Sequence, residues 1–274
     1  MQINKKFWNN KKVLVTGHTG FKGSWLSVIL KYLGANIYGY ALNPVGKNNL
    51  FNLLKINKIL KKDLRNDITN LKTLNNFIKK NKPEIIFHLA AQPSVIESFK
   101  DSKKTILTNI IGTANLLEAL KYQKSVKCLV IVTTDKVYQN YKFRKSFTEE
   151  SILGGDDIYS GSKACCEILT NSYYKSFFSD KNINIATVRA GNCFGGGDFT
   201  KDRIVKDCLE SFFQNKKLLL RSPMAQRPWQ HVIEPLTGYL TLAQKLCSKE
   251  GKKFIGPWNF GPSIKQNMKV IDLA

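Results

Sequence analysis

Short apolar runs alternate with longer amphipathic stretches over the first 190 residues of the chain. The apolar runs are rich in β-branched residues and are bounded by glycine or polar residues, which predicts buried strands. The amphipathic stretches repeat apolar residues three and four positions apart, which predicts helices that bury one face. Strands are predicted near 13–16, 36–42, 84–91, 126–134 and 183–190, and helices over 21–34, 69–84, 104–123 and around 158–163.

The stretch 69–84 illustrates how such a helix is recognised. Thr69 is expected to cap its first turn, because a hydroxyl can accept a hydrogen bond from a free main-chain N–H there. Four apolar side chains are expected to lie on one face, directed at the core. They are Leu71, Leu74, Phe77 and Ile78.

The alternation of strands and helices predicts an α/β fold with helices on both faces of a parallel sheet. The order of elements predicts a Rossmann-like, doubly wound nucleotide-binding domain over residues 1–189. From 190 to 274 glycine, proline and aromatic residues are more frequent and the periodicity is weaker. We expect a smaller substrate-binding region there, over the carboxyl ends of the strands, with some segments returning to the first domain.

A net charge of +23 raises the question of nucleic-acid binding. Most of the positive charge is lysine, spread along the chain among asparagines. Recognition of nucleic acid instead favours arginine and aromatic residues gathered in a patch. We therefore expect no nucleic-acid partner, although the positive field would still attract an anionic substrate.

Cysteine usage and hydropathy favour a cytoplasmic protein. None of the six cysteines forms a CxxC pair, and the three histidines lack the spacing of metal ligands, so reduced thiols and no metal are expected. No apolar run is long enough for a bilayer, and the first residues lack the apolar core of a signal peptide. No membrane partner is expected.

Three glycines follow the first predicted strand in "TGHTGFKG", at positions 17, 20 and 23. Glycine lets the main chain approach a pyrophosphate, whose charge then faces the amino end of the next helix. The pattern favours a dinucleotide site. The alternative is a tight turn whose glycines serve helix packing.

The second strand leaves the type of dinucleotide open. It ends in "GYALNP", where Asn43 is the nearest polar residue to the place at which an acid would bind the adenosine ribose. A neutral residue neither selects NAD nor rejects NADP by charge. Asp67 and Ile68 in "NDIT" are candidates for the adenine side, and a solvated turn is the alternative.

In "IYSGSK", Tyr159 and Lys163 lie four positions apart on a predicted helix. These positions are neighbours on one face, so the ammonium group can lower the pKa of the phenol. By spacing alone, a proton-transfer pair and an ordinary surface pair are both possible.

Further motifs follow in order between residues 13 and 262. They are "VLVTGHTGFKGSWL", "PEIIFHLAAQP", "TNIIGT", "VTTDKVY", "DIYSGSK", "TVRAGNCFGGGDF", "DRIV", "RPWQHVIEPLTGYLTLAQKL" and "WNFGP". With them the chain resembles the extended short-chain dehydrogenase/reductase family, and within it the CDP-glucose 4,6-dehydratase branch. The lysine of "TDK" points to this branch, because related deoxythymidine- and GDP-sugar dehydratases carry glutamate there and epimerases lack the acid/base pair.

The resemblance implies an NAD-dependent enzyme that dehydrates CDP-glucose to CDP-4-keto-6-deoxyglucose for deoxysugar and surface-polysaccharide synthesis. It also implies a homodimer or higher homo-oligomer, formed through helix 104–123 and the helix that holds Tyr159. The implied NAD-binding residues are Gly17, Thr19, Gly20, Phe21, Lys22, Gly23, Asp67, Ile68, Ala90, Tyr159 and Lys163.

The resemblance also assigns the catalytic roles. Tyr159, helped by Lys163, takes the 4-hydroxyl proton, and Thr134 holds the 4-oxygen. Asp135 is the acid that protonates the leaving 6-hydroxyl and Lys136 the base at C5, which would require a raised and a lowered pKa respectively. An exposed ion pair of Asp135 and Lys136 is the alternative.

Asn192, Arg203 and Arg227 are the implied substrate-binding residues. The arginine fork fits a diphosphate, with structural ion pairs as the alternative. We expect Trp229 to lie in the core and His231 to be a packed or hydrogen-bonded residue, not a catalyst.

Two other functions remain open from the sequence. One is another dehydratase or epimerase of the same superfamily. The other is a non-catalytic NAD-binding protein, because the chain ends at "MKVIDLA", where the family usually continues through more of its carboxyl-terminal domain. We therefore expect a substrate-binding region that is incomplete relative to the family, either because it is naturally shorter or because the sequence is incomplete.

Overall fold

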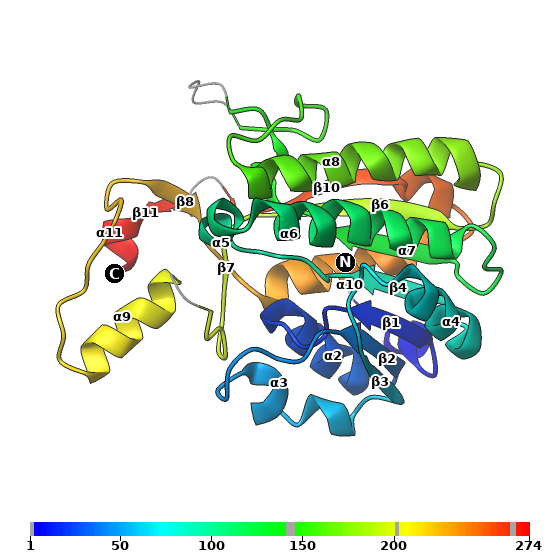
Figure 1. Cartoon of the computed structure of the whole chain (residues 1–274), viewed down its shortest axis with the longest axis horizontal. Coiled ribbons are helices and arrows are strands. Elements are labelled where there is room, and N and C mark those ends of the chain that lie inside the picture. Colours follow the sequence, from blue (N-terminus) through cyan, green and yellow to red (C-terminus); the bar gives the residue numbers. More distant parts are fainter. Residues whose placement is uncertain (1–2, 141–145, 201–202, 264–266) are drawn as a thin grey trace.

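Seven parallel strands form the central sheet of the protein (Figure 1). The computed structural model describes residues 3–140, 146–200, 203–263 and 267–274. In spatial order the strands are β10 (Gly256–Phe260), β6 (Asn184–Ala190), β5 (Cys128–Val132), β4 (Ile85–His88), β1 (Lys12–Thr16), β2 (Asn36–Ala41) and β3 (Lys62–Arg65). Every neighbouring pair is parallel, as the alternation of strands and helices predicts.

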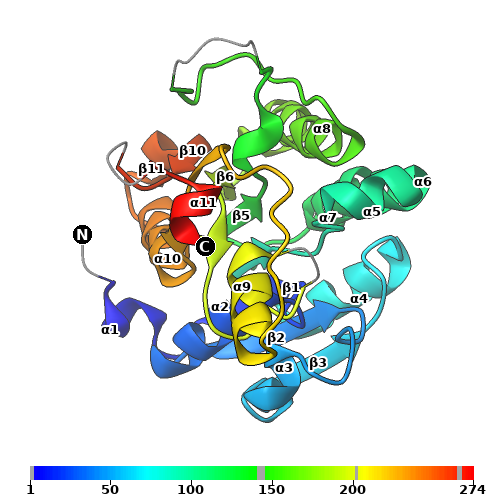
Figure 2. The ribbon, with the colours of Figure 1, turned by 90° about the vertical axis from the view of Figure 1, so that its left-hand side faces the viewer.

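Helices cover both faces of this sheet (Figure 2). One face carries α2 (Phe21–Tyr32) and α10 (Ile233–Leu246), and the other carries α4 (Leu71–Asn81), α7 (Gly112–Leu120) and α8 (Ile158–Tyr173). Successive residues of β1 alternate between the two cores, with Val13 and Val15 in one and Leu14 in the other. The doubly wound α/β fold is confirmed.

The remaining elements are short and lie mostly beyond the carboxyl ends of the strands (Figure 1). The helical ones are α1 (Lys5–Trp8), α3 (Leu50–Leu53), η1 (Ile56–Lys58), α5 (Val95–Lys100), α6 (Ser102–Ile106), η2 (Leu107–Ile111), η3 (Asp135–Val137), η4 (Tyr174–Phe178), α9 (Ile204–Phe213), η5 (Gly251–Phe254) and α11 (Val270–Leu273). The short strands are β7 (Cys193–Phe194), β8 (Gln226–Pro228), β9 (Gln230–His231) and β11 (Asn267–Lys269).

The cap of α4 differs from the expected one. Asn70 caps the helix through the N–H of Thr73, at 3.0 Å. Thr69 instead belongs to the preceding turn, where its N–H and hydroxyl both donate to Asp67 Oδ1. Of the predicted apolar face, Leu74 and Ile78 are fully buried, whereas Leu71 is largely exposed.

The single helix expected over 104–123 is interrupted. It consists of α6, the π-helical turn η2 and α7, so the helical register shifts partway along. Asn109 lies buried in the π turn, where its Nδ2 donates to the Gln92 carbonyl at 3.2 Å and to Ser162 Oγ at 2.8 Å. The turn thus ties the loop after β4 to α8.

Part of the chain after residue 190 belongs to the sheet. β10 pairs with β6, with Trp258 opposite Val188, and α10 packs against the first core. The functional division of the chain at residue 190 stays a prediction. Within the part of the chain that the structure describes, no helix is long and apolar enough to cross a membrane.

Candidate active site

The three glycines after β1 form a close-packed turn beneath α2. Gly17 has a φ of +73°, and a Cβ there would lie 2.6 Å from the Ala90 nitrogen. A Cβ at Gly23 would lie 2.2 Å from the Gly17 oxygen, whereas one at Gly20 would meet only that oxygen, at 3.4 Å. No side chain caps the amino end of α2 at Gly20. This tight turn leads into the uncapped amino terminus of α2, a helix of 12 residues. The free main-chain N–H groups there can bind the pyrophosphate of a dinucleotide.

The contrast between these glycines gives a prediction. Gly23→Ala is expected to destabilise the protein by roughly 1–3 kcal/mol, because its methyl group collides with a main-chain oxygen. Gly20→Ala is expected to change the unfolding free energy little, because its methyl group makes only an ordinary contact of 3.4 Å with the Gly17 oxygen, and to weaken NAD binding, because it lies at the helix end. Urea unfolding and NAD titration of both variants test this. Equal stability of the two would contradict the packing account.

Other predicted cofactor residues have varied surroundings. The Thr19 hydroxyl donates to the Leu42 carbonyl at 3.1 Å, which holds the glycine turn against the end of β2. Asp67 Oδ1 is used by the local turn at Thr69, which is the alternative considered for this residue. Ile68 is buried against α7. The roles of Asp67 and Ile68 beside the adenine ring therefore stay predictions.

An ionic group that the sequence did not suggest lies beside this turn. His18 Nε2 and Asp63 Oδ1 are 2.9 Å apart, and Arg65 Nη2 is 2.6 Å from Asp63 Oδ2. Burial of Asp63 opposes its ionisation, but hydrogen bonds and charge from His18 and Arg65 outweigh burial and lower its pKa. Arg65 Nη1 also lies 3.4 Å from the Leu42 carbonyl, at the end of β2. β3 itself was not predicted, so its side chains could not be placed.

The predicted catalytic residues meet at the carboxyl end of β5 and the start of α8. Tyr159 on α8 lies close enough to Thr134 and Asp135 for both to influence its pKa, and the Thr134 hydroxyl donates to Asp135 Oδ1 at 3.1 Å. Lys136 follows in η3 and is exposed. Lys163 is buried one turn after Tyr159, and its Nζ donates to the Val132 carbonyl at 3.0 Å. The fold therefore brings the tyrosine, the threonine and the acid together.

Burial dominates the ionisation of this group. It raises the pKa of Tyr159 to about 12, with a smaller increase from the charge of Asp135, against the opposing hydrogen bond of Thr134. The lowering of the Tyr159 pKa expected from Lys163 is therefore wrong, because burial of the phenol dominates. Burial also lowers the pKa of Lys163.

The pKa of Asp135 moves in the expected direction. Burial raises it and outweighs the opposing charges of Lys136, Lys22 and Arg227. A carboxyl group that is easier to protonate is suited to act as an acid. Lys22 also opposes the burial-raised pKa of Cys193, so this side chain lies on the catalytic side of the glycine turn. Phe21 beside it is near Gly195, where a Cβ would lie 3.3 Å from its ring.

A cavity of about 590 Å³ adjoins this group and is formed by residues after β6. Asn192, Arg203, Arg227 and Trp229 are among its lining residues. The two regions meet at Gly191, where a Cβ would lie 3.3 Å from Asp135 Oδ2.

The two arginines keep much of their capacity for an anion. Arg203 Nε lies 3.5 Å from Asp198 and its side chain is 44% exposed. Arg227 is exposed and donates to the main-chain carbonyl of Gln226, and the described residues place no carboxylate in an ion pair with it. Both arginines face the cavity as free or partly free cations, which favours ligand binding over a purely structural role.

Two aromatic expectations have different outcomes. Trp229 is not in the core: it lines the cavity, and its Nε1 has no hydrogen-bond partner among the described residues. His231 packs edge-on against Trp25 and Phe194, as expected of a packed histidine.

His88, under the site, gives a pH prediction. Its Nδ1 lies 2.8 Å from Thr16 Oγ1 and its Nε2 3.2 Å from Thr113 Oγ1. Burial, followed by the charge of Lys163, lowers its pKa from 6.5 to about 3. The unfolded chain therefore binds a proton below pH 6.5 that the native protein excludes until about pH 3, so stability is lost as the pH falls through this window.

The expected slope is about 1.4 kcal/mol per pH unit below the unfolded pKa. Between about pH 7 and about pH 5, the native chain is expected to lose about 2 kcal/mol more than His88→Gln does. Urea unfolding at both pH values measures the difference. Equal losses in the two proteins would show that His88 is already protonated in the native state.

Comparison with known proteins completes the picture of this site. The profile of the GDP-mannose 4,6-dehydratase family matches residues 14–254. The chain belongs to this family.

Two curated relatives and one solved structure show the range of similarity. The chain is 45% identical over 265 residues to the CDP-glucose 4,6-dehydratase of Salmonella typhimurium, covering 95% of this chain and 73% of that protein. It is 35% identical over 218 residues to the dTDP-D-glucose 4,6-dehydratase of Dictyostelium discoideum, covering 76% of this chain and about half (49%) of that protein. The dTDP-glucose 4,6-dehydratase of Bacillus anthracis, solved with NAD, superposes with a TM-score of 0.77 at 25% identity, over 96% of this chain and 79% of that chain.

Proposed function

We propose that this protein dehydrates CDP-glucose to CDP-4-keto-6-deoxyglucose, using NAD. The observation that carries the proposal is that Tyr159, Thr134 and Asp135 come together at the end of β5, with Lys136 next in sequence. It supplies a base for oxidation, an acid with a raised pKa and a second base. The 45% identity to the Salmonella enzyme supports CDP-glucose as the substrate.

Oxidation at C4 needs a base and a holder for the 4-oxygen. The glycine turn at Gly17, Gly20 and Gly23 would hold NAD, which would supply the oxidant for C4 and, once reduced, the hydride for C6. Tyr159 takes the proton of the 4-hydroxyl, and the neighbouring Thr134 orients that oxygen. Lys163 is held in place by the hydrogen bond from its Nζ to the Val132 carbonyl. Its positive charge favours the phenolate form of Tyr159.

Elimination of water needs an acid and a base on neighbouring carbons. The 4-keto group acidifies C5–H, and Lys136 removes that proton. Asp135, whose pKa burial raises, donates its proton to the 6-hydroxyl as it leaves. Lys136 then gives its proton back to C5 as C6 is reduced and so returns to its starting state. Asp135 ends the turnover as a carboxylate and Tyr159 ends it protonated, so one proton passes from Tyr159 to Asp135 through solvent to reset both.

The substrate diphosphate is assigned to the cavity beside Gly191. Asn192, Arg203 and Arg227 line it and supply amide and guanidinium donors. The net charge of +23 favours the approach of such an anion. An epimerase needs no acid/base pair at positions 135 and 136. A protein that only binds NAD gains nothing from burying Asp135. Neither alternative therefore explains why Asp135 and Lys136 are placed in this site.

A homodimer and a cytoplasmic location are part of the proposal. Apolar side chains stay exposed on the two helices expected to form the interface, which supports burial against a second copy. They are Ile106, Leu107, Ile111 and Ile168. Light scattering that returned the mass of a monomer would contradict the dimer. The proposed cofactor and substrate are both small cytoplasmic metabolites.

The activity is tested by incubating the purified protein with NAD and CDP-, GDP-, UDP- or deoxythymidine-linked glucose. Mass spectrometry follows the loss of one water, and alkaline ultraviolet absorbance follows the keto sugar. Dehydration of CDP-glucose in clear preference to the other sugars is expected. Dehydration of another sugar in its place would overturn the proposed substrate, and turnover with none would overturn the activity.

A further inference from the structure

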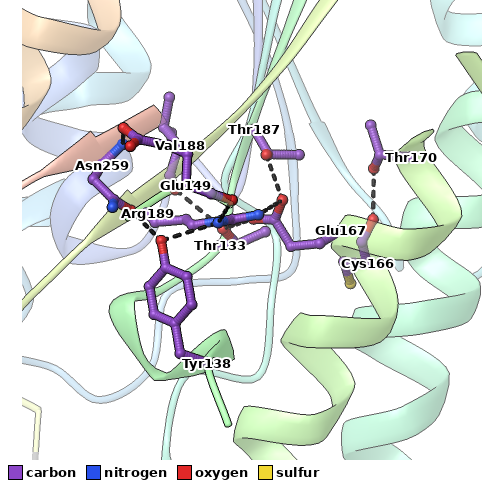
Figure 3. Close-up of polar contacts among 10 residues, drawn as sticks. All are labelled: Thr133, Tyr138, Glu149, Cys166, Glu167, Thr170, Thr187, Val188, Arg189 and Asn259. Atoms are coloured by element: carbon purple, nitrogen blue, oxygen red, sulfur yellow. Dashed lines mark hydrogen bonds and ion pairs between the residues drawn. The ribbon is translucent and has the colours of Figure 1, made fainter. Parts of the chain in front are cut away.

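Behind the catalytic residues lies a buried ion pair that the mechanism does not use (Figure 3). Glu167 on α8 and Arg189 on β6 are 2.9 Å apart, with side chains only 4% and 3% exposed. Removing two charges from water is costly and is tolerated when hydrogen bonds satisfy both groups. The partners of this pair therefore indicate what it holds.

Glu167 holds the residue just before the catalytic ones. Its Oε1 accepts a hydrogen bond from Thr133 Oγ1 at 2.5 Å (Figure 3). Thr133 is 5% exposed and directly precedes Thr134. Its main-chain N–H donates to the Val188 carbonyl at 2.9 Å, so strand pairing continues up to this point whether or not the hydroxyl is present.

Arg189 holds a residue that follows the catalytic segment closely. Its Nη1 donates to the hydroxyl of Tyr138 at 2.9 Å, and that hydroxyl donates to Asn259 Oδ1 at 2.5 Å (Figure 3). Tyr138 comes two residues after Lys136 and is also buried. Arg189 Nη1 lies 3.1 Å from the Glu149 carbonyl as well, which brings a further loop to the same guanidinium.

We propose that the Glu167–Arg189 pair positions the catalytic segment, by gripping Thr133 and Tyr138 on either side of Thr134, Asp135 and Lys136. Glu167 lies on α8, one turn after Lys163 and two turns after Tyr159. The pair therefore fixes the distance between the elimination residues and the helix that carries the oxidation residues. The catalytic consequence rests on the proposed function, whereas the structural consequence does not.

Thr133 offers a test with a matched control. Thr187 on β6 donates to the other carboxylate oxygen of Glu167, also at 2.5 Å, and is as deeply buried as Thr133. Thr133→Val and Thr187→Val each remove one hydroxyl bond to the same carboxylate without changing shape. Comparable decreases in melting temperature are expected, but only Thr133 belongs to the catalytic segment.

The expected result is that Thr133→Val lowers kcat about 10-fold with KM within about twofold, because Asp135 and Lys136 are displaced from the reacting carbons. Oxidation is expected to slow less than elimination, because Tyr159 lies on α8 and is not displaced, so reduced cofactor accumulates in a single turnover. Thr187→Val is expected to keep kcat within about twofold. Thr133→Ser, which restores the hydroxyl, is expected to recover the native kcat.

Hydrogen exchange of the amides at 134–138 gives a readout that needs no catalysis. Thr133→Val and Tyr138→Phe are expected to speed exchange there, and Thr187→Val is not. If wild-type protein does not turn over CDP-glucose but this exchange pattern holds, the proposed function fails and the positioning role stands. Equal effects of Thr133→Val and Thr187→Val on exchange, or on kcat, would overturn the positioning role. If Thr133→Val fails to fold, Tyr138→Phe decides by the same comparison.

Discussion

The Lys136→Ala variant is expected to oxidise CDP-glucose but to form almost no 4-keto-6-deoxy product. Lys136 is the proposed base at C5, and positioned bases of this kind contribute about 10²–10⁴-fold to rate. Tyr159 and Thr134 belong to the separate oxidation step and stay intact. Single-turnover absorbance should therefore show reduced cofactor forming and persisting, while mass spectrometry detects no loss of water.

Lys136→Arg is the matched variant for this experiment. Arginine keeps the positive charge but does not give up its proton in proteins, so it cannot act as the base. We expect it to be as inactive in elimination as Lys136→Ala. Substantial product from Lys136→Arg would show that position 136 acts through its charge, and normal product from Lys136→Ala would remove it from the mechanism.

The Tyr159→Phe variant is expected to lose both steps, because no base remains for the 4-hydroxyl. The decrease in kcat should again be about 10²–10⁴-fold, and no reduced cofactor should form. Tyr159 is nearly fully buried and its hydroxyl contacts Thr134, so phenylalanine preserves its packing. NAD affinity and melting temperature should change little compared with this loss.

Tyr173→Phe is the control for this second variant. Tyr173 lies on the same helix, its hydroxyl donates to Glu118 at 2.7 Å, and its pKa is also raised to about 12. It lies far along α8 from Tyr159 and should leave kcat unchanged. Accumulation of reduced cofactor in Tyr159→Phe would mean that another group removes the 4-hydroxyl proton.

Much of the sheet could be predicted because its signals are local. β1, β4 and β5 are mostly apolar runs, β6 is an apolar run interrupted by Thr187 and Arg189, and the glycines at 17, 20 and 23 come directly between a strand and a helix. β3 was missed because its four residues, "KDLR", are only partly buried. β10 was missed because its place depends on β6, more than 60 residues earlier in the chain, and no periodicity records such a pairing.

The identities of the site residues could be predicted from the sequence better than their pKa values. The motifs placed Tyr159, Thr134 and Asp135 near one another, but the extent of burial decided the direction of the pKa of Tyr159. The pair of Glu167 and Arg189 could not be foreseen, because it requires α8 to lie across the end of β6. The sequence alone does not indicate which charged residues will be buried against one another in the fold.

The measurement that tests the central claim most directly is the fate of deuterium placed at C4 of CDP-glucose. The account predicts that the purified protein, with NAD, yields a 4-keto-6-deoxy product carrying that deuterium at C6, with a solvent proton at C5. Such a result requires oxidation, elimination and reduction to occur on one bound sugar. Loss of the deuterium to solvent, or its retention at C4, would contradict this mechanism.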